Sequence, residues 1–253
     1  MKKTPAASSS SISILQPQER LIGLEIRGTA SLIQNNFAQK SVEQMLRKHM
    51  GLSVQRETKK PREVLEAATI RNLDGKVCVP PTAFKKGMLT AAMQVKGLKK
   101  TQLRTQLFVE GRSIPISYDE MTPRMDICRT SGMSRTPDVR FRPEFTNWKA
   151  RLVIAYADAL NEQTIVDLLQ RAGKVGVGEW RPEKDGTFGT YEVVRAIDDR
   201  KEMAEVRSEC SVALVPLRIP DWALDADISP ELLSRIAQGD EGEESEKDEE
   251  AAQ

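Results

Sequence analysis

Apolar and polar residues alternate in two stretches of the chain, which is the pattern of a β-strand with one buried face. In residues 20–29, Leu24 and Ile26 are separated by charged residues. In residues 148–157, apolar residues recur at every second position up to Tyr156. We expect both stretches to form core strands.

Helical spacing of apolar residues marks five further stretches. They predict helices at residues 31–50, 83–95, 161–171, 199–209 and 227–237. Thr82 and Asn161 precede two of these helices and are the expected N-caps. Shorter strands are predicted at residues 64–71, 76–79, 103–109, 113–117 and 211–217. This order of elements is typical of a ferredoxin-like or RRM-like α+β fold, with an antiparallel sheet and helices on one face.

The segment from Ala172 to Val194 is rich in glycine and also carries aromatic and basic residues. Residues 174–180 and 187–194 have the composition of strands, and Pro182 with an Asp-Gly pair supplies a turn between them. Glycine is kept where the backbone takes a positive φ or where another molecule approaches closely. We therefore expect a β-hairpin whose glycine-rich, basic and aromatic tip contacts another molecule. The alternative is a structural hairpin whose glycines serve only bulges and turns.

A long stretch, residues 112–147, is expected to be a basic insertion in the domain. Its part from residue 119 onwards has little periodicity and contains five arginines. Such a stretch inside a compact domain is usually functional or disordered. Arginine suits bidentate contact with phosphates and stacking on bases. The alternative is a solvated excursion whose arginines pair with the acids around them.

Charge is unevenly distributed along the chain, although the net charge is only +1. Between Lys85 and Arg104 there are six basic residues and no acid, a pattern that binds phosphates. Residues 240–250 instead contain eight acids and one lysine, so the chain is an acidic tail on a basic body. Such tails shield basic grooves, recruit basic protein partners or keep the protein soluble.

A chain of 253 residues with 39% apolar and 30% charged residues can bury one core, so one domain with appendages is expected. The expected parts are a flexible leader, the domain, a helical extension and a disordered acidic tail. They span residues 1–17, 18–218, 219–237 and 238–253. No apolar run is long enough to span a bilayer, and the leader lacks the apolar centre of a signal peptide, so we expect a cytoplasmic protein without membrane contact.

Three cysteines and one histidine limit the chemistry that the chain can support. The wide spacing of the cysteines argues against a disulfide framework and against a zinc site, so no metal and no cofactor is expected. A histidine-based triad is not expected either, although a general acid or base role for His49 remains open. The sequence therefore predicts no catalytic residues and favours binding over catalysis.

Two segments resemble the RAMP superfamily, the RNA-binding proteins of CRISPR effector complexes. The helix end and glycine-rich segment from Leu168 to Val193 resemble its C-terminal glycine-rich loop, and Val79 to Lys85 is similar to the helix entry of its backbone subunits. The chain is also similar to bacteriophage-encoded proteins that share the element Gly-Val-Gly-Glu-Trp-Arg-Pro-Glu-Lys-Asp-Gly, which would place it in a host cytoplasm. The resemblance implies a non-catalytic binder of nucleic-acid backbone, in which residues 119–147 act like the extended finger of the backbone subunits.

The sequence thus predicts a largely sequence-nonspecific binder of single-stranded RNA or DNA that can assemble side by side along the strand. The residues expected to contact nucleic acid are Lys85, Lys86, Lys99, Lys100, Arg129, Arg135, Arg140, Arg142, Lys174, Gly176, Gly178, Trp180, Arg181, Lys184 and Phe188. This prediction requires the basic helix and the glycine-rich segment to lie on one face. A phage structural or host-takeover protein that acts through protein contacts is a second hypothesis, and a metal-dependent nuclease is a third.

Overall fold

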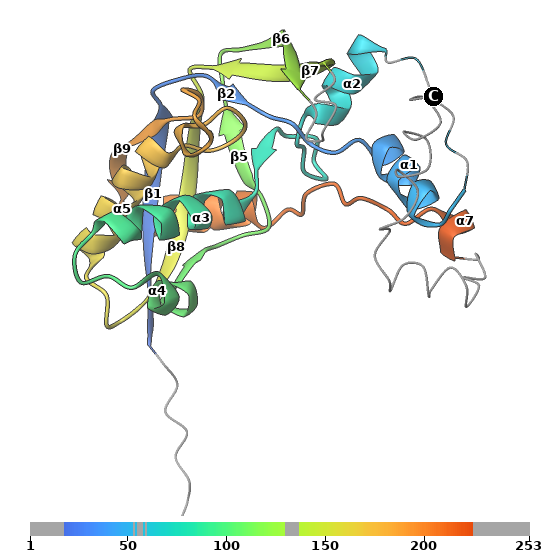
Figure 1. Ribbon diagram of the computed structural model, residues 1–253. Helices are drawn as coiled ribbons and strands as arrows, with labels where there is room; N and C mark the ends of the chain where they lie inside the picture. Colours follow the sequence, from blue (N-terminus) through green and yellow to red (C-terminus); the bar gives the residue numbers. More distant parts are fainter. Residues whose placement is uncertain (1–17, 53, 55–57, 59, 130–136, 225–253) are drawn as a thin grey trace, which may run out of the picture.

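The computed structural model of the chain describes residues 18–52, 54, 58, 60–129 and 137–224 (Figure 1). Its strands are β1 (Glu19–Gly28), β2 (Leu32–Ile33), β3 (Cys78–Val79), β4 (Leu107–Val109), β5 (Ile114–Ser117), β6 (Glu120–Arg129), β7 (Pro137–Thr146), β8 (Lys149–Ala157) and β9 (Tyr191–Ile197). Its helices are α1 (Gln39–His49), α2 (Pro61–Ala68), α3 (Pro81–Ala91), α4 (Lys100–Gln106), α5 (Glu162–Val175), α6 (Arg200–Cys210) and α7 (Asp221–Leu224), with short 3-10 helices η1 (Ala92–Gln94) and η2 (Pro182–Lys184). The predicted leader, most of the C-terminal extension and the acidic tail lie outside the described residues, and the domain boundaries stay predictions.

The main sheet has the strand order β3-β5-β8-β1-β9, and β4 also pairs with β8. Its pairings are antiparallel throughout. In chain order, α3 lies between β1 and β4, and α5 lies between β8 and β9. Two interleaved strand–helix–strand units therefore place β1 and β8 at the centre, which is the ferredoxin-like arrangement that the sequence predicts.

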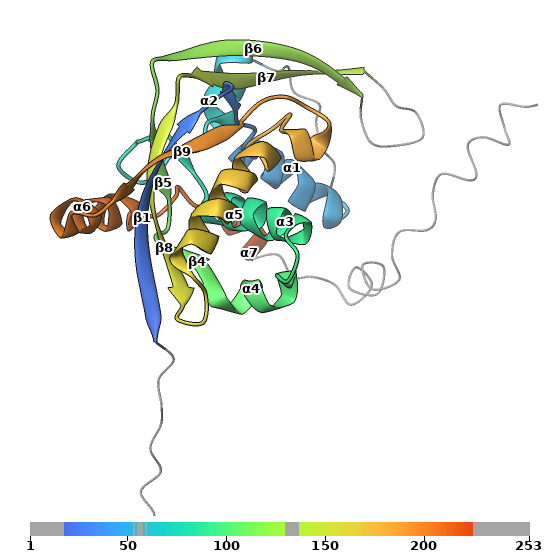
Figure 2. The ribbon, with the colours of Figure 1, turned by 90° about the vertical axis from the view of Figure 1, so that its left-hand side faces the viewer.

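The core lies between this sheet and helices α3 and α5 (Figure 2). The two alternating stretches are the two central strands, and Leu24, Leu152 and Ile154 are fully buried there. Helix α6 lies on the opposite face of the sheet and buries Val206 and Cys210. The expectation of helices on one face only is therefore wrong, because α6 carries an apolar side of its own.

The described part of the arginine-rich insertion is mainly regular structure, which corrects the prediction of an aperiodic stretch. Strands β6 and β7 pair antiparallel along ten residues each, and β2 extends them into a second, three-stranded sheet (Figure 1). Charged side chains occupy the partly buried positions, while Met125 and Ile127 are exposed on the other face. The alternation is hidden in the sequence because the polar face of this ribbon is the packed one.

The sequence predicts a β-hairpin for the glycine-rich segment, and this prediction is wrong. Helix α5 continues through Gly173 to Val175, and residues 176–190 form a loop that contains η2. Of the two strands predicted for this hairpin, only the second forms, as β9, and it pairs with β1. We call residues 176–190 the glycine-rich loop.

Five local predictions also need correction. Residues 103–106 belong to helix α4, so only the end of the strand predicted at residues 103–109 forms, as β4. Residues 64–71 are mostly helix α2, and the predicted first helix begins only at Gln39, since β2 pairs with β7. Residues 211–217 contribute one isolated bridge, between Asn72 and Leu214, instead of a strand. Helix α3 has Pro80 as its N-cap and Pro81 in its first turn, whereas the predicted cap Asn161 does accept a hydrogen bond from the backbone of Gln163. Among the described helices, none is long and apolar enough to cross a membrane.

Two buried helical glycines provide a matched test of the packing. A Cβ atom at Gly173 would overlap the carbonyl oxygen of Tyr191, whereas one at Gly87 would lie 3.4 Å from the Cβ of Ala172. We expect Gly173→Ala to lower the free energy of unfolding by about 3 kcal/mol through overpacking. Gly87→Ala should be neutral or stabilising by up to about 1 kcal/mol, because alanine is the better helix former. Urea unfolding of the two variants measures both values, and equal effects would contradict this packing.

The burial of the three cysteines determines which thiols should react in the folded protein. Burial raises the pKa of Cys78, and burial together with the charge of Glu209 raises the pKa of Cys210 to about 12. Both thiols should stay protonated and unreactive near pH 8, whereas the half-buried Cys128 should react. We expect Ellman's reagent to modify one thiol in the native protein, none in Cys128→Ser, and the remaining two only after denaturation. Rapid native modification of Cys128→Ser would contradict the described burial.

Candidate nucleic-acid interface

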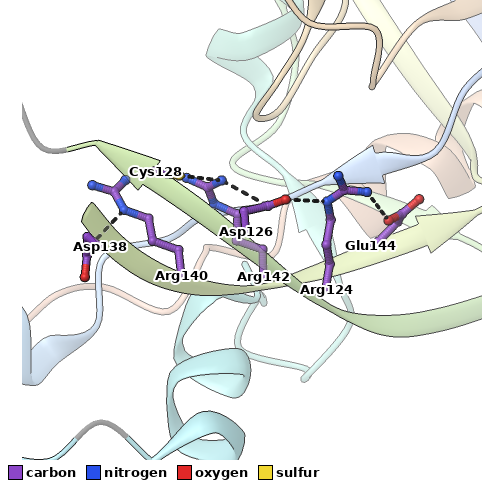
Figure 3. A network of polar contacts seen from close by, with 7 residues as sticks. All are labelled: Arg124, Asp126, Cys128, Asp138, Arg140, Arg142 and Glu144. Carbon is purple, nitrogen blue, oxygen red and sulfur yellow. Dashed lines mark hydrogen bonds and ion pairs between the residues drawn. The ribbon is translucent and has the colours of Figure 1, made fainter. Parts of the chain in front are cut away.

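The polar face of the β6–β7 ribbon is turned towards the glycine-rich loop (Figure 2). Seven of its side chains make polar contacts with one another, five of them in one connected chain and Arg140 with Asp138 as a separate pair (Figure 3). They are Arg124, Asp126, Cys128, Asp138, Arg140, Arg142 and Glu144. The alternation of the two strands places all of them on the same side of the ribbon.

Asp126 joins the two central arginines of this network. Its carboxylate accepts from Nε of Arg124 at 2.8 Å and from Nη1 of Arg142 at 3.3 Å. Arg124 also donates to Glu144 at 3.1 Å, and its hydrogen bonds to Glu144 and, to a smaller extent, to Asp126 raise the pKa of Arg124. Arg142 is only 2% exposed, and its Nε has no partner among the described residues. The acids therefore hold both guanidinium groups in fixed positions.

Both arginines face aromatic rings of the glycine-rich loop. The guanidinium carbon of Arg124 lies 4.8 Å from the ring centroid of Phe188, and that of Arg142 lies 5.8 Å from the ring of Trp180. These distances are in the range of cation–π contacts. Trp180 is 39% exposed, so one surface of the site combines ordered cations with an accessible aromatic ring.

Trp180 has an unusual backbone conformation, with φ of 52°. The left-handed region disfavours bulky side chains and costs about 1 to 2 kcal/mol for a residue with a Cβ atom. The conformation is held by the turn that follows, because Phe188 donates its N–H to the carbonyl of Trp180 at 2.9 Å. Gly186 packs so closely against this carbonyl that a Cβ atom would overlap it. The loop is built to present Trp180 in this position.

The glycines at the two ends of the loop are explained by the chain's own backbone. A Cβ atom at Gly178 would overlap the carbonyl of Ile33, and one at Gly189 would overlap that of Val177. Glu179 donates its N–H to Ile33 at 2.9 Å, so the loop is fastened to β2. The close approach that the sequence predicted is therefore made, at these positions, by neighbouring segments of the same chain.

A basic residue of α3 meets the glycine-rich loop at Glu183. This carboxylate lies 2.7 Å from Nη2 of Arg181 and 3.9 Å from Nζ of Lys86, and Thr90 is 3.2 Å away. Burial alone would raise the pKa of Glu183, but the hydrogen bonds from Arg181 and the charge of Lys86 outweigh it and lower the pKa. The two predicted basic regions thus come together at Lys86 and Arg181.

Lys85 has a different environment from its neighbour Lys86. Its Nζ donates to the carbonyl of Arg104 at 2.9 Å and lies 3.9 Å from the ring centroid of Phe108. Burial lowers the pKa of Lys85. Lys85 is therefore directed towards α4 and β4, away from the glycine-rich loop.

The structure brings Lys86, Arg142, Trp180, Arg181 and Phe188 together and leaves other predicted residues apart. Lys99 and Lys100 lie at the start of α4, beyond α3 from the loop, and Arg129 lies at the end of β6 (Figure 2). Arg140 pairs with Asp138 at 3.4 Å, Lys174 is exposed in the last turn of α5, and Lys184 is exposed in η2. Gly176 ends α5, and Arg135 lies outside the described residues.

Sequence reasoning missed three residues of this site, Arg124, Asp126 and Glu183. The first two follow the two-residue spacing of a strand, but their alternation with Met125 and Ile127 was not interpreted as a ribbon. Glu183 carried no signal, because its partners come from a distant helix. Across residues 18–52, 54, 58, 60–129 and 137–224, no three histidine, cysteine or acidic side chains are grouped as a metal site would require.

A second charged surface lies on the α6 face of the main sheet, around a hollow of about 440 Å³. Its arginines are paired with glutamates: Arg195 contacts Glu25 and Glu202, and Arg151 contacts Glu202 and Glu209. No aromatic side chain lines this hollow. Among the described residues, the lining of this hollow therefore lacks the combination of cations and rings found at the glycine-rich loop.

Comparisons with known proteins give weak likenesses only. No protein-family model and no curated protein matches the sequence. The chain is similar to one chain of the cryo-EM structure of the type III-B Cmr-beta bound to cognate target RNA, with a TM-score of 0.44 and 8% identity, over 71% of this chain and 60% of that chain. It is also similar to the crystal structure of Cmr6 from Pyrococcus furiosus, with a TM-score of 0.39 and 9% identity, over 71% of this chain and 100% of that chain. Neither likeness places this chain in a family.

Proposed function

We propose that this protein binds single-stranded RNA or DNA, without catalysis and largely without regard to sequence. The binding surface is the polar face of the β6–β7 ribbon together with the last turn of α5, the glycine-rich loop and the exposed side of α3. We call it the ribbon–loop face. Side-by-side assembly along the strand and a basic protein partner for the acidic tail stay predictions.

The conformation of Trp180 is the observation that carries this proposal. A half-exposed indole in a left-handed conformation is costly for the fold, and such strain is retained mainly where it serves a site. The ring lies beside the buried guanidinium of Arg142, which leaves its other surface for a ligand. Stacking of a base on an aromatic ring is tolerant of sequence and contributes about 1 to 3 kcal/mol.

Two kinds of cation belong to this surface. Arg124 and Arg181 are held by acids, so little side-chain entropy remains to be lost when they contact a phosphate. Lys174 and Lys184 are exposed and have no ion-pair partner among the described residues. The lysines can attract a polyanion over a distance, while the arginines offer donors in fixed directions.

The first test reverses the two free lysines. Lys174→Glu with Lys184→Glu should weaken binding of single-stranded oligonucleotides at least ten-fold at about 50 mM salt, and lower the salt slope by about 1.4 if both lysines contact phosphates. Fluorescence anisotropy with single-stranded RNA, single-stranded DNA and duplex at about 50 and 200 mM salt measures both quantities.

The matched control is Arg200→Glu with Lys201→Glu on α6, which changes the net charge equally on the other face. Equal losses in the two double variants would show that the ribbon–loop face is not the binding surface. A wild-type protein that ignores every oligonucleotide at low salt would remove the proposal and favour protein contacts. Cleavage of the oligonucleotides that depends on a divalent metal would favour a nuclease instead.

The second test concerns Trp180. Trp180→Ala should weaken binding by about 1 to 3 kcal/mol, and Trp180→Phe should retain most of the affinity, because a phenyl ring still stacks. In a Trp222→Phe background, single-stranded oligonucleotides should also quench the tryptophan fluorescence when Trp180 is present but not in Trp180→Phe, since the remaining Trp148 is fully buried. Full affinity in Trp180→Ala, with unchanged quenching, would show that this ring is not a stacking surface.

A further inference from the structure

A small cavity of about 200 Å³ opens between β2, the start of α3 and the glycine-rich loop. Most of its wall is apolar and comes from Leu32, Ile70, Val79, Pro80 and Ala83. Asn35, Glu179 and Arg181 add polar groups. The cavity is smaller than the pockets of about 300 to 1,000 Å³ that take drug-sized ligands, so it suits a single ring system.

The polar groups of this cavity differ in how many of their hydrogen-bond donors and acceptors already have partners. Gln34, also in the wall, is 3% exposed and fully engaged, because it donates to the carbonyl of Cys78 at 2.9 Å and accepts from the N–H of Ile70 at 2.8 Å. The side chains of Asn35 and Glu179 have no hydrogen-bond partner among the described residues. Arg181 uses three N–H groups on Glu183 and Gly178, which leaves two of its five. A donor set and a carboxylate are thus free beside an apolar wall.

The cavity adjoins the ribbon–loop face. Glu179 and Arg181 line it, and Trp180 between them carries the exposed ring. Trp180 is next in sequence to two residues of the cavity wall, so a strand that stacks one base on its ring can offer a neighbouring base to the cavity, beside Arg181. Extruded bases are held in this way, by apolar surfaces on their faces and hydrogen bonds on their Watson–Crick edge.

We propose that this cavity receives one base of the bound strand and that it selects guanine. This inference rests on the proposed function and adds one base-selective position to a mode of binding that is otherwise nonspecific. The Watson–Crick edge of guanine has two adjacent donors, N1–H and N2–H, which match the two oxygens of the Glu179 carboxylate. Its O6 is an acceptor that the free N–H groups of Arg181 or Asn35 can reach in the same plane.

The other bases fit this donor and acceptor pattern less well. Adenine and cytosine have one amino donor next to a ring nitrogen that is an acceptor, and uracil and thymine have one N–H between two carbonyls. Each of them would place an acceptor opposite the carboxylate. A base that covers the Glu179 carboxylate without donating to it lowers the affinity of the strand, so the difference between bases should be substantial.

The experiment compares single-stranded RNAs about 12 nucleotides long that differ at one central position in a uracil context. We expect the guanine form to bind about ten-fold more tightly than the adenine, cytosine and uracil forms. Inosine in place of guanosine, which lacks the N2 amino group, should lose much of this preference. The corresponding DNA series should show the same order, because the recognised edge is common to both.

Glu179→Gln is the decisive variant, since glutamine keeps the shape and replaces one acceptor by a donor. This variant should bind the guanine and uracil forms with about equal affinity, and its affinity for the uracil form should stay the same or rise. Glu205→Gln, an equal charge change on the exposed side of α6, is the control and should keep the preference. Thermal unfolding of both variants shows that they are folded.

The outcomes separate this inference from the proposed function. Salt-dependent binding of all four forms with equal affinity would overturn the guanine pocket and leave the proposed function standing. The same preference in wild type and Glu179→Gln would also overturn the pocket, because the selection would then come from another place. Absence of binding to every RNA and DNA would remove both.

Discussion

A buried positive charge determines how the ribbon–loop face is built. Arg142 is almost completely enclosed, and an unpaired guanidinium in such a place would cost several kcal/mol. Asp126 on the partner strand offsets this cost only in the observed register, which sets Arg124 opposite Arg142 and Asp126 opposite Arg140. A slip by one residue would turn Asp126 to the outer face of the ribbon. The ion pair and the register therefore stabilise one another, and together they direct the polar face of the ribbon to the loop.

The central sheet could be predicted from the sequence because large apolar residues recur at every second position of its two central strands. Leu24 and Ile26 in β1 alternate with charged residues, Leu152 and Ile154 in β8 keep the same spacing although Val153 between them is also buried, and the helix capped by Asn161 has an equally clear period. The ribbon could not be predicted in this way. Its packed face is charged, and its exposed face carries apolar residues, so the usual relation between hydrophobicity and burial is reversed.

The members of the candidate site could be chosen from the sequence, but their contacts could not. Trp180, Arg181 and Arg142 stand out by residue type in a glycine-rich or arginine-rich context. The sequence does not show that Arg142 lies under Trp180, or that Lys86 instead of Lys85 meets Arg181. These contacts depend on how a loop, a helix and a ribbon far apart in the chain come together. The acids that pair with the cations are hidden for the same reason.

The pairing of the arginines with acids affects both affinity and selectivity. Each buried carboxylate removes part of the attraction for a polyanion, so a surface of this kind depends on contact geometry more than on net charge. Glu179 extends this effect to its cavity, where a free carboxylate beside a phosphate chain repels every strand equally. Only a base that donates to it can offset the repulsion. A negative charge at this place therefore selects by excluding bases without matching donors, and the selection costs some affinity for the strand as a whole.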